Sequence, residues 1–237
     1  MTTMATVRRR QGGEHEESYF VSMTDMMVGL VFVLMVMLVY YALQYRQTTV
    51  ELTDTKVRRT QLLQSVQSQL KTQNVNVVVD IDSGVLRLPE DVLFDKGSDV
   101  VKPEGVQVLR KVGLAILAKA PCYTQAHPPP GCPVTQAGLE SVFVEGNTDS
   151  DQMSGARDNW NLSADRAVNT YRALMGQTPA LLNVKNARLR PADPQPLFGV
   201  SGYGPSRPVA PETSEANKRL NRRIDIRFNV VTPQQVH

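Results

Sequence analysis

The feature that most constrains this chain is an apolar stretch from Phe20 to Leu43 that contains a single charged residue, Asp25. At ~1.5 Å per residue, a helix of this length reaches roughly 36 Å, and the hydrocarbon core of a bilayer is about 30 Å thick. The stretch is too long for the apolar region of a cleavable signal peptide, and no small-residue cleavage site follows it. We therefore expect one transmembrane helix over residues 19–43, which keeps the protein anchored in the membrane.

Asp25 allows two interpretations. A carboxylate inside a membrane-spanning helix costs at least ~2.5 kcal/mol, so such residues usually face a partner helix, a cavity or an ion path. Alternatively, Ser22, Thr24 and Asp25 cap the helix N-terminus, where short polar side chains and negative charge are stabilising. A cap would start the helix near Met26 and leave the apolar residues of 19–23 without burial. The pattern therefore favours an ion-translocating role for Asp25.

The composition argues against several functional classes. The formal net charge of +3 is too small and too scattered for a nucleic-acid-binding surface. The three histidines, His15, His127 and His237, lie far apart in the chain and give neither a catalytic triad nor metal-ligand spacing. We expect a protein that is not an enzyme and that binds no metal or cofactor.

The two cysteines, Cys122 and Cys132, bracket a short proline-rich loop. Such a pair either closes a small disulfide ring in an oxidising compartment or remains as two free thiols, and we favour the disulfide. The orientation in the membrane is not settled by charge, because three arginines at 8–10 precede the apolar stretch and four basic residues between 46 and 59 follow it.

The rest of the chain divides into a tail, a stalk and one domain. Residues 1–18 are polar and of mixed charge, which is typical of a disordered tail. Residues 44–73 contain no Gly or Pro and indicate a continuing helix or loose coiled-coil stalk that would hold two copies side by side. The apolar residues of this segment recur at approximately helical spacing: Val57, Leu63, Val66 and Leu70. Residues 74–237 are long enough for one soluble domain.

Strand and helix patterns alternate within this domain, so the expected fold class is α+β. The predicted elements, in chain order, are strands over 77–81 and 85–88, a helix over 103–117, a strand over 141–146, a helix over 162–175 and strands over 198–203 and 224–230. A turn at Asp82-Ser83-Gly84 joins the first two strands as a hairpin. The order is βαβαβ-like with hairpin additions.

Several blocks in this domain resemble the OmpA-like peptidoglycan-binding family. They are Leu93–Ser98 followed by Lys102–Gly105, Val144–Asp149, Asn159 with Leu162–Ala167, Gly202–Gly204 and Asn221–Arg223. The blocks occur in the family's order and cover roughly residues 75–231. As a set they are specific, although each block alone is short. The resemblance implies an OmpA-like α+β domain that binds the bacterial cell wall.

In that family an Asp and an Arg clamp the diaminopimelate of the cell-wall peptide, and the matching residues are Asp149 and Arg166. An Arg suits a ligand carboxylate and an Asp suits an ammonium group. Asn159, Leu162 and Asn221 are expected to shape the pocket. The structural alternative is a local turn at Asp149 and an ion pair of Arg166 that closes the fold. The segment between Asp149 and Asn159 is longer than the family's usual spacing, so the pocket loop is expected to differ.

The whole chain resembles MotB-type stator subunits, which combine one span, an acidic residue near its cytoplasmic end, a stalk and an OmpA-like domain. The match includes residues 19–27, although flagellar members usually have Ala before the acidic residue and this chain has Thr24. The shorter basic tail and the Cys-bracketed loop make the chain more similar to the MotB-like subunits of Zorya anti-phage defence systems. Because peptidoglycan is periplasmic, the resemblance implies an inner-membrane protein with a cytoplasmic N-terminus and a periplasmic domain.

The resemblance also implies partners and a mechanism. A homodimer of this chain would be enclosed by a pentamer of a MotA-like multi-span subunit, and Asp25 would carry the translocated ion, a proton in preference to sodium. Protonation would neutralise Asp25 and lower the cost of its contact with the partner's apolar wall. Two alternatives stay open: a flagellar MotB-type stator subunit, and a passive cell-envelope tether in which Asp25 is only a cap.

Overall fold

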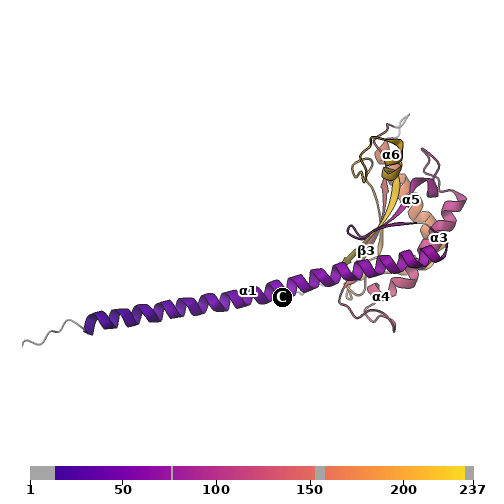
Figure 1. Cartoon of the computed structure of the whole chain (residues 1–237). Coiled ribbons are helices and arrows are strands. Elements are labelled where there is room, and N and C mark those ends of the chain that lie inside the picture. Colours follow the sequence, from indigo (N-terminus) through magenta and orange to yellow (C-terminus); the bar gives the residue numbers. More distant parts are fainter. Residues whose placement is uncertain (1–13, 76, 153–157, 233–237) are drawn as a thin grey trace, which may run out of the picture. The chain divides into compact units, whose positions relative to one another are not determined.

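A computed structural model describes residues 14–75, 77–152 and 158–232 (Figure 1). The chain separates into two compact units, Met1–Val50 and Glu51–His237. Most of the predicted tail lies outside the described residues. The described part has a mixed α+β composition, with one long helix followed by a five-stranded sheet and shorter helices.

The first unit holds the candidate membrane span. The long helix α1 extends from Glu14 to Thr72, and its Val21–Arg46 segment is the one described segment long and apolar enough to cross a membrane. The helix begins before Asp25, so Asp25 lies in its interior. A cap must lie at the first turn, where backbone N–H groups lack intrahelical partners. The cap interpretation of Asp25 is therefore wrong, and residues 14–18 are helical where a disordered tail was expected.

The last part of α1 belongs to the second unit, which begins at Glu51. Continuation of the helix to Thr72 agrees with the predicted segment 44–73. The prediction of a separate stalk is wrong for its C-terminal part, because its apolar residues are buried in the domain's own core. These buried residues are Leu62, Leu63, Val66 and Leu70, whereas Val57 stays exposed.

The sheet lies at the centre of the second unit and contains all five predicted strands. They are β1 (Val78–Asp80), β2 (Val85–Pro89), β3 (Gly138–Asn147), β4 (Phe198–Gly202) and β5 (Arg223–Val231), in the spatial order β1-β2-β5-β3-β4. Only β3 and β4 pair in parallel, joined by a crossover through helix α5 (Asn159–Gln177). A parallel pair needs such a crossover, and it brings the ends of β3 and β4 and the start of α5 to one edge of the sheet.

One face of the sheet forms the apolar core with helix α3 (Pro103–Lys119), α5 and the end of α1. Helices α3 and α5 were both predicted from their apolar periodicity. The pattern does not predict four shorter helices: α2 (Glu90–Leu93), α4 (Pro121–Thr124), a 3-10 helix (Pro179–Asn183) and α6 (Glu215–Asn221). These pieces are too short for a periodic apolar face to be recognised.

The opposite face of the sheet carries buried charges. Arg223 Nε lies 3.0 Å from Asp225 Oδ2, and Arg227 donates two hydrogen bonds of 2.8 and 2.9 Å to Glu145. Arg223 Nη2 also donates to the Arg207 carbonyl in the loop after β4 (3.1 Å). Burial raises the pKa of Asp225 and lowers the pKa of Arg223. The predicted half-buried strand β5 is thus buried on part of its polar side as well.

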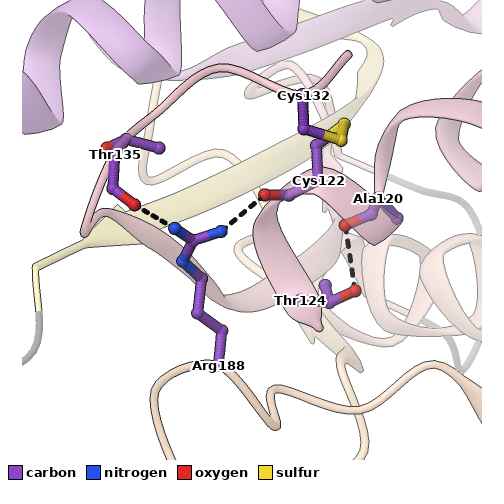
Figure 2. Close-up of a disulfide and its surroundings, with 6 residues drawn as sticks. All are labelled: Ala120, Cys122, Thr124, Cys132, Thr135 and Arg188. Atoms are coloured by element: carbon purple, nitrogen blue, oxygen red, sulfur yellow. Dashed lines mark hydrogen bonds between the residues drawn. A yellow bond between two sulfur atoms is a disulfide. The ribbon is translucent and has the colours of Figure 1, made fainter. Parts of the chain in front are cut away.

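Cys122 and Cys132 form the predicted disulfide, with their Cα atoms 5.3 Å apart. Figure 2 shows the guanidinium of Arg188 directed at two carbonyls near the disulfide. Arg188 donates to the Cys122 carbonyl (2.8 Å) and to the Thr135 carbonyl, so one side chain joins the two ends of the loop.

The segment after Cys132 is also bonded to the end of α1. Thr135 Oγ1 donates to Asp54 Oδ2 (2.7 Å), and Arg58 Nη2 donates to the Val134 carbonyl (3.2 Å). Asp54 and Arg58 pair with each other at 2.8 Å one helical turn apart. The segment just after the disulfide loop is therefore bonded to α1.

Replacing both Cys122 and Cys132 by Ser should lower the free energy of unfolding of the second unit by about 3 kcal/mol, because the open loop has more freedom in the unfolded state. Urea unfolding can be followed through Trp160, the single tryptophan of the chain. Wild type in reductant is the matched control and should behave like the double variant. Thiol labelling of the full chain purified without reductant should find no free thiol; two reactive thiols would contradict the disulfide.

Candidate ligand-binding site

The residues predicted to bind peptidoglycan gather at one edge of the sheet. Asp149 follows β3, Asn159 and Leu162 lie in the first turn of α5, and Arg166 lies one turn further. Asn221 ends α6 just before β5. The end of β3 pairs with the start of β5, so these segments meet at the same edge. Leu162 is buried there, as a residue that shapes an apolar wall would be.

Arg166 is buried, with only 2% of its side chain exposed. Its Nη2 contacts Glu90 Oε1, its Nε donates to the Ser98 carbonyl (2.7 Å), and its Cζ lies 5.1 Å from the centre of the Phe94 ring. Burial lowers the pKa of Arg166, and the Glu90 carboxylate opposes that shift. In this structure Arg166 therefore makes the ion pair of the structural alternative.

Asp149 is also paired within the protein. Its Oδ2 lies 2.5 Å from Arg222 Nη1, while Arg222 Nε lies 2.7 Å from Glu90 Oε2 and Arg222 Nη2 lies 2.7 Å from Glu215 Oε1. Burial acts to lower the pKa of Arg222, but hydrogen bonds to Asp149 and Glu215 outweigh it and raise the pKa. Four residues thus form a row of alternating charge, which we call the charge row: Arg166, Glu90, Arg222 and Asp149.

The two predicted asparagines hold the backbone around the charge row. Asn159 Nδ2 donates to the carbonyls of Asp149 (3.1 Å) and Asp151 (2.8 Å), which fixes the start of the segment after β3. Asn221 is fully buried, and it accepts from the Ala210 N–H (3.1 Å) and donates to the Ala210 carbonyl (2.9 Å). Both side chains bond to backbone groups, and Asn221 also donates to Glu212 Oε1 (2.9 Å), so they shape the site through the loops that they hold.

Close packing of α5 on the strands explains why the charge row can form. A Cβ atom on Gly146 would lie 1.9 Å from the Ser163 carbonyl oxygen, and one on Gly202 would lie 2.6 Å from the Ala164 nitrogen. Ser163 Oγ accepts a hydrogen bond from the Gly204 N–H (2.9 Å). Glycine at these positions lets the helix backbone touch β3 and β4, and this contact brings Arg166 within reach of the other charges.

The sequence pattern did not identify Glu90 and Arg222 as site residues. Arg222 lies inside the Asn221–Arg223 block, so that signal was present. Glu90 begins a four-residue helix, and no local pattern marks it.

The longer segment after Asp149 is only partly described, since residues 153–157 lie outside the described residues. Among the described residues no group of three His, Cys, Asp or Glu is arranged to hold a metal ion.

The charge row offers both signs of charge at the sheet edge and can recognise a ligand that carries an ammonium and a carboxylate group. In the structure both signs are compensated internally. A ligand must therefore replace contacts that the protein makes with itself. Asp25 belongs to the first unit.

Comparison with known proteins agrees with this fold. No protein-family model matches the chain. Among curated proteins it is similar to the probable lipoprotein YiaD of Escherichia coli, with 29% identity over 162 residues, 68% of this chain and 58% of that protein. It is also similar to Motility protein B of Bacillus subtilis, with 22% identity over 144 residues, 60% of this chain and 43% of that protein. The chain therefore matches less than two thirds of the length of either relative.

Among solved structures, the chain is similar to a putative MotB-like protein from Desulfovibrio vulgaris. The TM-score is 0.53 at 23% identity, and the match covers 77% of this chain and 98% of that chain. At this identity the similarity is one of fold. It confirms the predicted α+β fold class, and the chain therefore shares the fold of a MotB-like protein.

Gly146→Ala should destabilise the second unit by about 3 kcal/mol or more, because the added methyl group meets a backbone carbonyl that moves only if α5 shifts. Gly176→Ala is the matched control within α5, since its Cβ would have no atom within 4 Å. That change should be neutral or slightly stabilising. Urea unfolding followed through Trp160 measures both variants, and equal stability of Gly146→Ala and wild type would contradict the close packing.

Proposed function

We propose that this chain is the anchoring subunit of a proton-driven rotary motor in the bacterial inner membrane, a MotB-like stator subunit that binds peptidoglycan and acts in anti-phage defence. The observation that carries the proposal is the meeting of Asp149 and Arg166 in one charge row at the sheet edge. These two residues come from separate blocks of the OmpA-like signature, one just after strand β3 and one in helix α5.

The ligand of this site is the diaminopimelate of the cell-wall peptide. Its free end carries an ammonium and a carboxylate group, which match the carboxylate of Asp149 and the guanidinium of Arg166. The similarity to Motility protein B and the shared fold with a MotB-like protein support a role of this kind.

The ion-driven step belongs to Asp25. Its position inside α1 supports a carboxylate at membrane depth, where the charged form is costly unless it faces a partner or an ion path. Protonation removes that cost and lets the helix pass the apolar wall of a MotA-like partner; release of the proton restores the charge. Each charge moved through 100 mV supplies about 2.3 kcal/mol for a rotation step.

The assembly is a dimer of this chain inside a pentamer of the MotA-like subunit, with the N-terminus in the cytoplasm and the second unit in the periplasm. The disulfide between Cys122 and Cys132 supports this orientation, because disulfides persist in oxidising compartments. Peptidoglycan binding holds the dimer still so that the partner ring turns around it.

The defence role is supported by Thr24 before Asp25 and by the Cys-bracketed loop, which set this chain apart from flagellar MotB-type subunits. The genes that neighbour the gene for this chain distinguish a defence role from a flagellar role. A gene for a MotA-like partner beside helicase or nuclease genes would support defence, and flagellar genes beside it would overturn that part of the proposal.

Asp149→Ala and Arg166→Ala should each reduce binding to isolated peptidoglycan by at least tenfold, because a ligand charge loses its partner at a cost of a few kcal/mol. The assay is sedimentation of the full chain with purified sacculi, beside co-purification with the membrane partner. Co-purification should be unchanged, since that contact lies in the bilayer.

Arg172→Ala is the matched control for Arg166→Ala, because Arg172 is an exposed arginine of the same helix. Both Asp149 and Arg166 are buried in ion pairs, so urea unfolding through Trp160 must show that each variant is folded. A folded double variant that sediments like wild type would show that the site is wrong.

Asp25→Asn should leave membrane insertion and partner binding intact but abolish ion-driven function, because the amide has nearly the same size and does not titrate. Asp25→Glu, which keeps a titrating carboxylate, is the control and should retain part of the activity. Proton flux into vesicles containing the assembled complex and protection of cells against phage are the two readouts. Wild-type flux and protection in Asp25→Asn would favour the passive tether.

A further inference from the structure

Glu90 forms an ion pair with the guanidinium of Arg166, the group that the proposed function assigns to the ligand's carboxylate. Its Oε1 contacts Arg166 Nη2 and its Oε2 lies 2.7 Å from Arg222 Nε, so one carboxylate bridges two arginines. The Glu90 side chain is only 7% exposed. We infer that Glu90 is an internal competitor of the ligand, and that the site selects a ligand able to replace Glu90 at Arg166 and Arg222 at Asp149 at the same time. This inference rests on the proposed function.

A ligand carboxylate can reach Arg166 only if a covering group moves, because the side chain is 2% exposed. Two of its contacts are main-chain carbonyls, those of Ser98 (2.7 Å) and Asp95 (3.5 Å), and moving them requires a shift of the chain. The Phe94 ring, 5.1 Å from Arg166 Cζ, is held in the apolar core, whereas the Glu90 side chain lies outside that core and can rotate about single bonds. Glu90 is therefore the group that yields.

Glu90 can yield because it has a second cation. A buried carboxylate without a counter-charge is costly, so it would stay in place if Arg166 were its only partner. Arg222 contacts both Glu90 and Asp149, and it keeps Glu90 when Arg166 is released. The protein thus holds a ready partner for the displaced carboxylate.

The ligand's ammonium completes the exchange. It takes the place of Arg222 at Asp149, while the ligand's carboxylate takes the place of Glu90 at Arg166. Glu90 and Arg222 then stay paired with each other, so each of the four buried charges keeps an opposite charge. A ligand that lacks the carboxylate, such as an amidated diaminopimelate, leaves Glu90 at Arg166 and binds weakly. The charge row therefore selects the zwitterionic end of the cell-wall peptide over its amidated form.

The test compares two soluble probes, a synthetic tetrapeptide L-Ala-γ-D-Glu-meso-diaminopimelate-D-Ala and the same peptide with the side-chain carboxylate of diaminopimelate amidated. Calorimetric titration into the full chain in detergent gives the two dissociation constants. Wild type should bind the free-carboxylate peptide more tightly than the amidated one, and Glu90→Gln should tighten binding of the free-carboxylate peptide by about tenfold, because a neutral amide holds Arg166 less strongly.

Two controls separate competition from a general change of charge. Asp91→Asn removes a negative charge from the neighbouring residue, whose carboxylate pairs with Arg219 instead, and should leave both dissociation constants unchanged. Glu90→Gln combined with Arg166→Ala should show no gain over Arg166→Ala alone, because the gain passes through Arg166. If Glu90→Gln does not fold, Glu90→Asp keeps the charge on a shorter side chain and should also tighten binding.

The outcomes distinguish this inference from the proposed function. If wild type binds the free-carboxylate peptide but the folded Glu90 variants bind it no more tightly or more weakly, Glu90 is a positioning residue and competition is wrong. Equal affinity of wild type for the two peptides would likewise overturn the exchange. If wild type binds neither the peptide nor sacculi, the proposed function fails, and the inference fails with it.

Discussion

The charge row at the edge of the sheet is the interaction on which the second unit most depends. Its members come from α5, from α2, from the junction between α6 and β5 and from the segment just after β3, so four segments of the chain are joined by three ion pairs. A buried charge that loses its partner costs about 3–5 kcal/mol, so none of these segments can move away alone. The same groups that close the fold are those proposed to bind the ligand. Under the proposed function, recognition would take the form of an exchange between internal and external partners.

The rest of the second unit holds the charge row in position. Apolar side chains fill one face of the sheet, and α3, α5 and the end of α1 cover them. Gly146 and Gly202 remove the side chains that would hold α5 away from β3 and β4, which sets the depth at which Arg166 lies. On the other face, the ion pairs of Glu145 and Asp225 tie β3 and β5 to the loop that follows β4. The sheet edge is thus supported from both faces.

The proposed motor needs the properties of both units in one chain. Under the proposed function, Asp25 would supply a carboxylate inside an apolar helix, and the charge row would supply the attachment against which a partner turns. The last part of α1 is buried in the core of the second unit and bonded to the segment that follows the disulfide loop. In the proposed motor, a force that reaches this part of the helix would be borne by packed leucines and by the hydrogen bonds to Val134 and Thr135.

Local patterns in the sequence determined the strands, the two main helices and the unusual position of Asp25, and they favoured the Cys122–Cys132 disulfide, because each depends on periodicity or spacing within a short segment. The blocks that resemble the OmpA-like family also identified Asp149 and Arg166 as candidate site residues. Only the tertiary structure decided what these residues contact. Arg166 and Glu90 are 76 positions apart, and no pattern along the chain encodes their ion pair. The burial of the last turns of α1 was hidden for the same reason: a stripe of leucines predicts that a helix face is covered, but the identity of the covering surface depends on how distant segments fold together.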